Sequence, residues 1–258
     1  MNITYIHHSC FSVEIADAVM LFDYYKGCIP MFDLGKHIYV FASHKHHDHF
    51  DKNVFELAKT YPNITFILSN DIRMNDTYMD RNDIPTSVRD RIVYIGKDEK
   101  VKFPLSVDVI EKQSINSEIV SIDSSFIVET LASTDQGVAF LVSYQGKVIY
   151  HAGDLNWWTW QGETIEEYND MTSRFQKEMS KLEGKEIDVA FVPVDPRQED
   201  RFWWGLNSFM KATHTKVVFP MHFWMDYTVI TKIKSLDQSK EYADRIMDIL
   251  VEGQQFII

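Results

Sequence analysis

Cysteine is scarce in this chain, because the 258 residues include only Cys10 and Cys28. Two cysteines are too few for a disulfide framework, and without a C-x-x-C pair neither is expected to bind zinc. Long apolar runs are also lacking, since no segment approaches the roughly 20 apolar residues that span a bilayer. The first residues, MNITYIHHSC, have neither the basic leader nor the apolar stretch of a signal peptide. These absences predict a cytoplasmic protein with no membrane contact.

Positive charge is in deficit as well. The chain has 26 Lys and Arg residues against 38 Asp and Glu residues, and its net charge is −12. Binding to a nucleic-acid backbone uses Lys and Arg to neutralise phosphates, and no run rich in these residues is present. We therefore expect no nucleic-acid partner.

No proline-rich linker, low-complexity tract or abrupt change of composition divides the chain. With 45% hydrophobic residues the sequence can bury a large core, although its length alone would allow either one domain or two. We expect a single domain over residues 1–258.

Short apolar runs rich in β-branched and aromatic residues predict buried strands. They lie at 38–42, 64–68, 126–131, 187–194 and 216–221. Helical patterns lie between and after them. Asp51 can cap a helix through about Tyr61, residues 163–183 form a second, and part of 238–251 is expected to form a last helix with an apolar stripe.

Two segments resemble each other, residues 11–23 and residues 140–154. Each consists of a strand, a tight turn and a second apolar strand that ends in Asp. Two such halves facing each other would form a β-sandwich. Because strands and helices alternate elsewhere, the sheets are expected to carry helices on their outer faces.

The densest group of metal-binding residue types is SHKHHDHF at 43–50, directly after the strand predicted at 38–42. Residues two apart in extended backbone point the same way, so His44 and His46 can chelate one metal ion. A solvated loop that happens to be rich in histidine is the alternative. Because four of the ten histidines lie within these positions, metal binding is favoured.

The turn after His46 can direct further side chains to a second ion. Asp48 and His49 are the candidates, whereas His47 falls on the opposite face and is not expected to be a ligand. A carboxylate beside a metal-activated water can also hold the nucleophile and relay protons, so Asp48 is the candidate catalytic residue.

Two further residues follow predicted strands. Gly153 permits a sharp turn that leaves Asp154 at the end of one strand, and His222 follows the strand at 216–221. Taken alone, Asp154 could simply cap a helix and His222 could be structural.

The H-x-H-x-D-H pattern at 44–49 resembles the metallo-β-lactamase superfamily, and the resemblance extends over most of the chain. His8-Ser9 is similar to the Gly-His-Ser element of the UlaG-like and related metal-dependent hydrolases, with His7 where glycine is usual. YHAGD at 150–154 and PMHFW at 220–224 resemble the segments that carry the later ligands of that family. The resemblance implies an αββα four-layer sandwich of the α/β class.

The resemblance also implies a ligand set for two divalent metal ions. One ion would take His44 and His46, the other would take Asp48, His49 and His222, and Asp154 would bridge them. The family normally supplies a third histidine to the first ion, but this chain reads ASTDQG at 132–137. Asp135 is the expected replacement, with Ser133 a weaker alternative. Zinc is the expected metal, and the added oxygen ligand also suits manganese or iron.

Other residues are candidates for substrate binding or support. His8 can reach the site and contact substrate, and Trp224 is expected at the mouth of a pocket. The other tryptophans, Trp157, Trp158 and Trp160 with Trp203 and Trp204, are expected to wall the pocket, although a packing role is an alternative for each. His151 is expected to orient a ligand, and Asp195 either faces the same rim or caps the next segment.

The expected activity is hydrolysis of an ester, lactone or phosphoester bond in a small molecule by metal-activated water. Two alternatives remain open: a degenerate protein that binds metal without turnover, and a diiron redox domain of the same fold. A homo-oligomer is compatible with this sequence.

Overall fold

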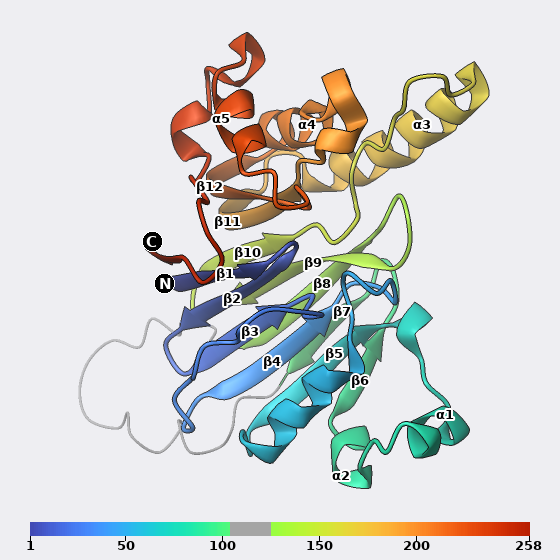
Figure 1. Cartoon of the computed structure of the whole chain (residues 1–258), viewed down its shortest axis with the longest axis vertical. Coiled ribbons are helices and arrows are strands. Elements are labelled where there is room, and N and C mark those ends of the chain that lie inside the picture. Colours follow the sequence, from blue (N-terminus) through green and yellow to red (C-terminus); the bar gives the residue numbers. More distant parts are fainter. Residues whose placement is uncertain (104–124) are drawn as a thin grey trace, which may run out of the picture.

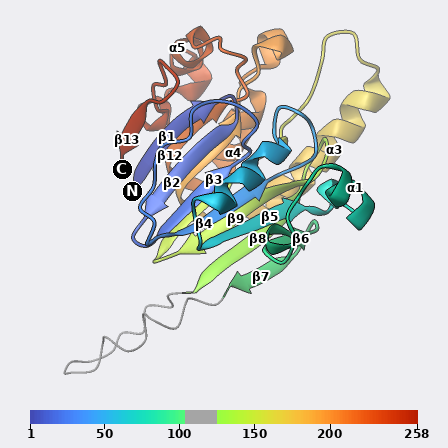
Figure 2. The ribbon, with the colours of Figure 1, turned by 60° about the horizontal axis from the view of Figure 1, so that its bottom comes forward.

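The computed structural model describes residues 1–103 and 125–258. In these ranges the chain forms two β-sheets that face each other, with helices outside both (Figures 1 and 2). This arrangement is the predicted αββα sandwich, and the fold prediction is confirmed.

The first sheet contains seven strands in the order β13-β1-β2-β3-β4-β5-β6. Its strands are β1 Asn2–His7, β2 Cys10–Ile15, β3 Ala18–Phe22, β4 His37–Ala42, β5 Ile64–Ser69, β6 Ile92–Ile95 and β13 Gln255–Ile257. The hairpin β2–β3 is antiparallel, whereas β3, β4, β5 and β6 are parallel to one another. The parallel strands therefore present their carboxyl ends at one edge.

The second sheet contains six strands in the order β12-β11-β10-β9-β8-β7. Its strands are β7 Lys100–Phe103, β8 Phe126–Ala132, β9 Val138–Tyr144, β10 Lys147–His151, β11 Glu186–Pro193 and β12 His214–Met221. β10, β11 and β12 are parallel. β9–β10 is the antiparallel hairpin predicted at residues 140–154, the second of the two similar segments.

The inner faces of the two sheets share one aromatic core. The rings of Phe11 and Phe191 lie 4.4 Å apart between centroids, and those of Tyr39 and Phe126 lie 3.8 Å apart. Along β4, Tyr39 and Phe41 enter this core, whereas Ile38, Val40 and Ala42 belong to a second core under the helices of the first sheet. This alternation, expected for a strand, buries both faces of β4.

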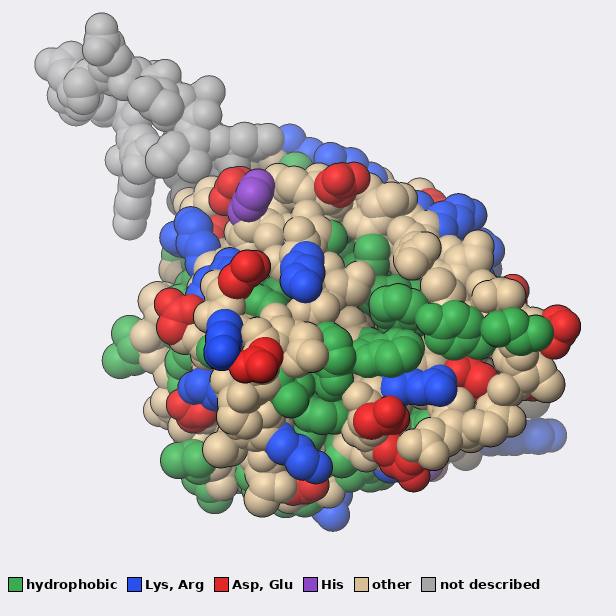
Figure 3. Space-filling model, turned by 90° about the horizontal axis from the view of Figure 1, so that it is seen from above, with side chains coloured by type: hydrophobic (Ala, Val, Ile, Leu, Met, Phe, Trp, Pro, Cys, Tyr) green, Lys and Arg blue, Asp and Glu red, His purple; other side chains and the backbone are tan. Residues whose placement is uncertain are grey.

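Helices cover the outer faces of the sheets. α3 Ile165–Leu182, α4 Trp204–Ala212 and α5 Thr228–Lys234 lie outside the second sheet, and α1 Asp76–Arg81 and α2 Thr86–Arg89 lie beyond the first (Figure 1). Figure 3 shows the face on which α3, α4 and α5 lie. Hydrophobic side chains gather near the middle of this face, among charged side chains of both signs. In the described part of the chain, no helix has both the length and the apolar character needed to cross a membrane.

Two predicted helices agree with the structure. α3 begins with a capping box, in which the Thr164 hydroxyl accepts from the Glu167 N–H and the Glu167 side chain accepts from the Thr164 N–H. Asp51 caps the other helix, but Lys52–Lys59 forms a 3₁₀ helix rather than an α-helix.

The helix predicted within 238–251 is wrong. This segment contains only short 3₁₀ turns, Asp237–Ser239 and Ala243–Arg245. After these turns the chain runs beside β12, where the Met247 N–H donates to the Val218 carbonyl over 2.9 Å. The apolar residues Ile246 and Ile249 are still buried, but as an irregular segment against the sheet.

Candidate metal centre

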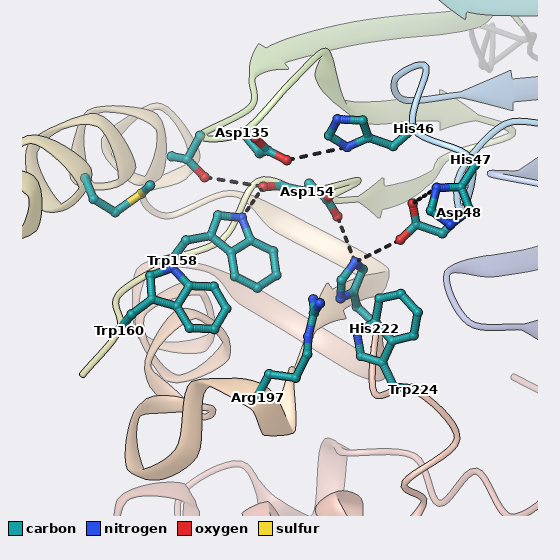
Figure 4. Close-up of a pocket in the computed structure, with 12 residues that line it drawn as sticks. His46, His47, Asp48, Asp135, Asp154, Trp158, Trp160, Arg197, His222 and Trp224 are labelled. Atoms are coloured by element: carbon teal, nitrogen blue, oxygen red, sulfur yellow. Dashed lines mark hydrogen bonds and ion pairs between the residues drawn. The ribbon is translucent and has the colours of Figure 1, made fainter. Parts of the chain in front are cut away.

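Chain segments far apart in sequence converge where strands end. β4 leads to His44, β10 leads to Asp154, β12 leads to His222 and β1 leads to His8. In the described part of the chain, eight donor residues lie in two adjacent groups, which we call the inner group and the outer group. Figure 4 shows those that line the cavity: His46, Asp48, Asp135, Asp154 and His222. The inner group is His8, Asp48, His49 and His222, and the outer group is His44, His46, Asp135 and Asp154.

The inner group is rich in nitrogen and is shielded from solvent. Nε2 of His8 lies 3.5 Å from Oδ2 of Asp48, and Nε2 of His222 lies 3.7 Å from the same oxygen. The ligand atoms of all four residues lie within 4.8 Å of one another. The histidines, His49 included, are buried. Three imidazoles and one carboxylate suit a zinc ion.

The outer group contains two imidazoles and two carboxylates. Nε2 of His44 lies 3.4 Å from Oδ2 of Asp154, and Nδ1 of His46 lies 3.6 Å from Oδ2 of Asp135. The His46 and Asp135 side chains are 37% and 46% exposed, so this group opens to solvent. Asp135 therefore lies beside His46 in the outer group, which is the position expected of the residue that replaces the missing histidine.

Asp154 lies between the two groups. Its Oδ2 faces His44, whereas its Oδ1 lies 3.2 Å from Nε2 of His49 and 3.5 Å from Nε2 of His222. Each oxygen therefore faces a different group. A carboxylate in this position can contribute one oxygen to each of two cations.

Among the described residues, three buried atoms at this place have no hydrogen-bond partner: Nε2 of His8, Nε2 of His49 and Oδ1 of Asp154. An unpaired buried polar atom costs about 1–3 kcal/mol, so a cluster of three needs a compensating partner. A cation would satisfy all three once His49, whose pKa is raised by the nearby Asp154 and Asp23, releases the proton of its Nε2. The residues present therefore fit a divalent metal ion.

The protonation states also suit metal binding. Burial lowers the pKa of His8 to about 4, so its imidazole is neutral at pH 7. Burial alone would raise the pKa of Asp48, but the close approach of His8 and the nearby His49 hold it well below its usual value. A metal ligand must be deprotonated, and both side chains are.

Asp23 is a site residue that the sequence analysis did not identify. It is completely buried at the end of β3 and accepts hydrogen bonds from the Ser43 N–H, the Ser43 hydroxyl and Nδ1 of His49, each over 2.7 Å. The bond to His49 leaves its Nε2 free to face Asp154. The signal in the sequence was its place at the end of residues 11–23, the first of the two similar segments, where it corresponds to Asp154 in the second.

Asp195 supports the other side of the site. Its Oδ2 accepts from Nδ1 of His222 over 3.0 Å and from Nε1 of Trp224 over 3.3 Å. A carboxylate behind a histidine ligand fixes its tautomer and orientation. Interaction with His222 and Arg197 outweighs burial and lowers the pKa of Asp195 to about 2. Asp195 is buried behind His222 rather than in the cavity wall, and it also caps the following 3₁₀ helix by accepting from the Arg197 N–H.

The loops around His44 approach one another closely. A Cβ atom on Gly137 would lie 1.9 Å from the Ser43 carbonyl oxygen, and one on Gly153 would lie 2.6 Å from Cβ of Ser43. Both glycines have positive φ, as do the non-glycine site residues His8 and His222. Such left-handed backbone is uncommon outside glycine and is concentrated at functional sites.

His151 contacts backbone rather than a metal-ligand side chain. Its Nε2 donates to the Ser9 carbonyl over 2.9 Å and its Nδ1 accepts from the Gly153 N–H over 3.1 Å. It therefore holds the turn before Asp154, so any support that it gives this residue passes through the backbone. His47 is 92% exposed, as its predicted outward direction requires.

A cavity of about 560 Å³ opens beside both donor groups. It is lined by His46, His47, Asp48, Thr134, Asp135, Asp154, Trp158, Trp160, Met171, Arg197, His222 and Trp224. Trp224 lies in this wall, as expected. Trp157 does not, because its side chain turns away to pack 5.5 Å from Phe175 and to donate to the Thr172 hydroxyl. Of the tryptophans expected in the wall, Trp158 and Trp160 line this cavity, whereas Trp157, Trp203 and Trp204 do not.

Comparison with known proteins gives one family. Residues 2–222 match the model described as the beta-lactamase superfamily domain. No curated protein sequence shows significant similarity to the chain.

Solved structures show the same fold at low sequence identity. A metallo hydrolase from the archaeon Ignicoccus hospitalis has 15% identity and a TM-score of 0.57, with 100% of this chain and 98% of that chain covered. Human tRNase Z, short form, has 14% identity and a TM-score of 0.54, with 100% and 99% covered. A mutant of CmlA, a diiron β-hydroxylase from Streptomyces venezuelae, has 11% identity and a TM-score of 0.60, with 100% and 54% covered.

Proposed function

Because the chain belongs to the beta-lactamase superfamily, we propose that it is a metal-dependent hydrolase acting on an ester, lactone or phosphoester bond of a small molecule. The single observation that carries this proposal is the position of Asp154, whose two oxygens face two separate groups of donor atoms. Such a pair of groups at the floor of one cavity suits two cations that act on one substrate.

The inner and outer groups would hold two divalent ions, with His8 as an additional donor to the inner one. Bound ions of this kind lower the pKa of water and stabilise the anion that develops at a carbonyl or phosphoryl centre. The inner group favours zinc, whereas the carboxylates of the outer group also accept manganese or iron.

Asp48 is the proposed catalytic residue. Its carboxylate is kept ionised by the surrounding imidazoles and lines the cavity, so it can orient the attacking water and relay its proton. No serine or cysteine is among the described residues that line the cavity, and the Thr134 hydroxyl is already bonded to the backbone oxygens of Asp154 and Asn156. Water is therefore the proposed nucleophile.

Diiron oxidation is a second candidate. It is favoured by the two carboxylates of the outer group, Asp135 and Asp154, because oxygen-rich sites suit iron. The similar fold of the diiron β-hydroxylase agrees with this candidate at the level of the fold alone.

Metal analysis followed by a substrate screen tests these candidates. The protein would be purified without added metal, its metal content measured by mass spectrometry, and activity measured on phosphodiesters, lactones and thioesters. Zinc or manganese with turnover that is lost in Asp48→Asn supports the hydrolase. Bound iron with reduction of dioxygen supports the second candidate, and metal binding without any turnover supports a degenerate protein.

A small-molecule substrate, a cytoplasmic location and a homo-oligomeric state remain predictions. The cavity volume suits a small molecule, because ligand pockets of about 300–1,000 Å³ enclose ligands of that size.

A further inference from the structure

We propose that the substrate is a small anion with a flat apolar part, in which Arg197 binds a carboxylate or phosphate group and three tryptophans hold the apolar part. This inference rests on the proposed function and names its substrate class. Its basis is the arrangement of Arg197, Trp158, Trp160 and Trp224 around the cavity.

Arg197 is the only Lys or Arg among the described residues that line the cavity. Figure 4 shows its guanidinium pointing toward the space between Trp158 and His222. His222 belongs to the inner donor group. An anion bound to Arg197 would therefore lie beside the donor groups, within the same cavity.

The guanidinium is held in place while part of it stays available. Nε and Nη2 donate to the Asp195 carboxylate, and the guanidinium carbon lies 4.6 Å from the centre of the Trp224 ring. The Asp195 contacts occupy one side of the planar group, so Nη1 can donate to a ligand. Preorganisation of this kind lowers the entropy cost of binding an anion.

Three tryptophans supply the apolar surface. Trp158 and Trp160 are stacked with their ring planes 6° apart, and Trp224 lies beside His222. Trp160 and Trp224 are each 40% exposed although both line the cavity. Large rings exposed in a concave site typically cover a ligand, and flat walls select a flat apolar group.

A matched pair of probes tests the proposal: indole-3-acetate, a flat anion, and indole-3-acetamide, its neutral counterpart. Their dissociation constants would be measured by calorimetry on zinc-loaded protein, with the metal content of each variant measured in parallel. We expect the wild type to bind the acetate at least about tenfold more tightly than the amide. Arg197→Gln should weaken acetate binding by about tenfold and change amide binding little, as for loss of a charge-assisted hydrogen bond.

Two further variants complete the design. Arg89→Gln is the matched control, because Arg89 also pairs with an aspartate, Asp80, but lies on α2 outside the cavity. It should bind both probes as the wild type does. Trp160→Ala should weaken both probes to a similar degree, since it removes apolar contact and no charge and the Trp160 ring does not contact Arg197.

Several results would overturn the proposal. Undiminished acetate preference in a fully loaded Arg197→Gln variant would mean that the anion binds elsewhere. Equal binding of acid and amide by the wild type, or no binding of either tighter than about 1 mM, would contradict the substrate class. Failure of the proposed function would be seen in other measurements. The protein would then bind no metal or hydrolyse none of the substrates in the screen, regardless of how the two probes bind.

Discussion

The inner and outer donor groups differ in ligand chemistry and in shielding. The inner group has three buried imidazoles and one carboxylate, whereas the outer group has two imidazoles and two carboxylates and opens to solvent at His46 and Asp135. Neutral nitrogen donors in a closed setting suit zinc, and oxygen donors in an open one suit manganese or iron as well. The comparison teaches that one fold can offer two unlike metal sites side by side.

The supporting residues explain part of this difference. In the inner group, His49 is held by Asp23 and His222 is held by Asp195, and both aspartates are fully buried. In the outer group, His44 contacts the Ser43 hydroxyl, but His46 and Asp135 lie on exposed loops. Ligands fixed by a second layer of hydrogen bonds bind metal more tightly, so the inner group is expected to fill first.

The largest effect is expected for Asp154→Ala, because this substitution removes the donor that both groups share. Metal affinity at both groups should fall by at least about 100-fold, since loss of even a supporting residue costs 10- to 100-fold. Activity should be abolished while the circular dichroism spectrum stays that of a folded protein. Retention of full turnover would show that Asp154 does not bridge two ions.

His46→Ala should cause a smaller loss of bound metal than Asp154→Ala, because it removes a donor from the outer group alone. The variant should keep the tightly bound ion, lose the weaker one and lose activity, as measured by metal content and turnover. The matched variant His8→Ala removes a donor from the inner group and should instead weaken the tightly bound ion. If both variants lost the same ion, the division into two groups would be wrong.

Asp135→His should sharpen the comparison by making the groups more alike. The substitution replaces the outer oxygen donor with an imidazole, so zinc affinity at the outer group should rise about tenfold relative to manganese. Competition between the two metals, followed by their quantification, measures this preference. An unchanged ratio would indicate that Asp135 is not a ligand.

The smallest effect is expected for Asp188→Asn, a carboxylate outside both groups. Asp188 accepts from the Val148 N–H and pairs with Lys216, and these contacts outweigh burial and lower its pKa. Because the folded pKa lies below the unfolded one, the stabilisation is present above about pH 4 and is lost as the pH falls. Urea unfolding should show a loss of about 1 kcal/mol at pH 7 and a smaller difference at pH 3. A change in metal content would contradict the assignment of this residue.

Much of the fold could be predicted because local patterns carry it. Each apolar run taken as a buried strand became one, from β4 at His37–Ala42 to β12 at His214–Met221. The exception, the helix expected within 238–251, had a helical apolar stripe, but pairing with the backbone of β12 decides its conformation. Tertiary contacts of this kind override local propensity and leave no local mark in the sequence.

The donor residues could be predicted because they cluster in one motif or follow strands, as His44, Asp154 and His222 do. Asp23 and Arg197 were missed because their roles depend on which strands and loops become neighbours. Trp157 and Trp158 were both expected to wall the pocket, and only Trp158 does so. They are adjacent in sequence, and only the backbone turn after Asp154 decides which ring faces the cavity.

The shared carboxylate of Asp154 has a consequence for how the two ions are acquired. An ion in one group neutralises and orients the side chain that the other group must use, so the two occupancies are thermodynamically linked. Such linkage is reciprocal, and its free energy is the same whichever group fills first. A metal titration should therefore depart from two independent isotherms, and the identity of one ion should change the affinity for the other.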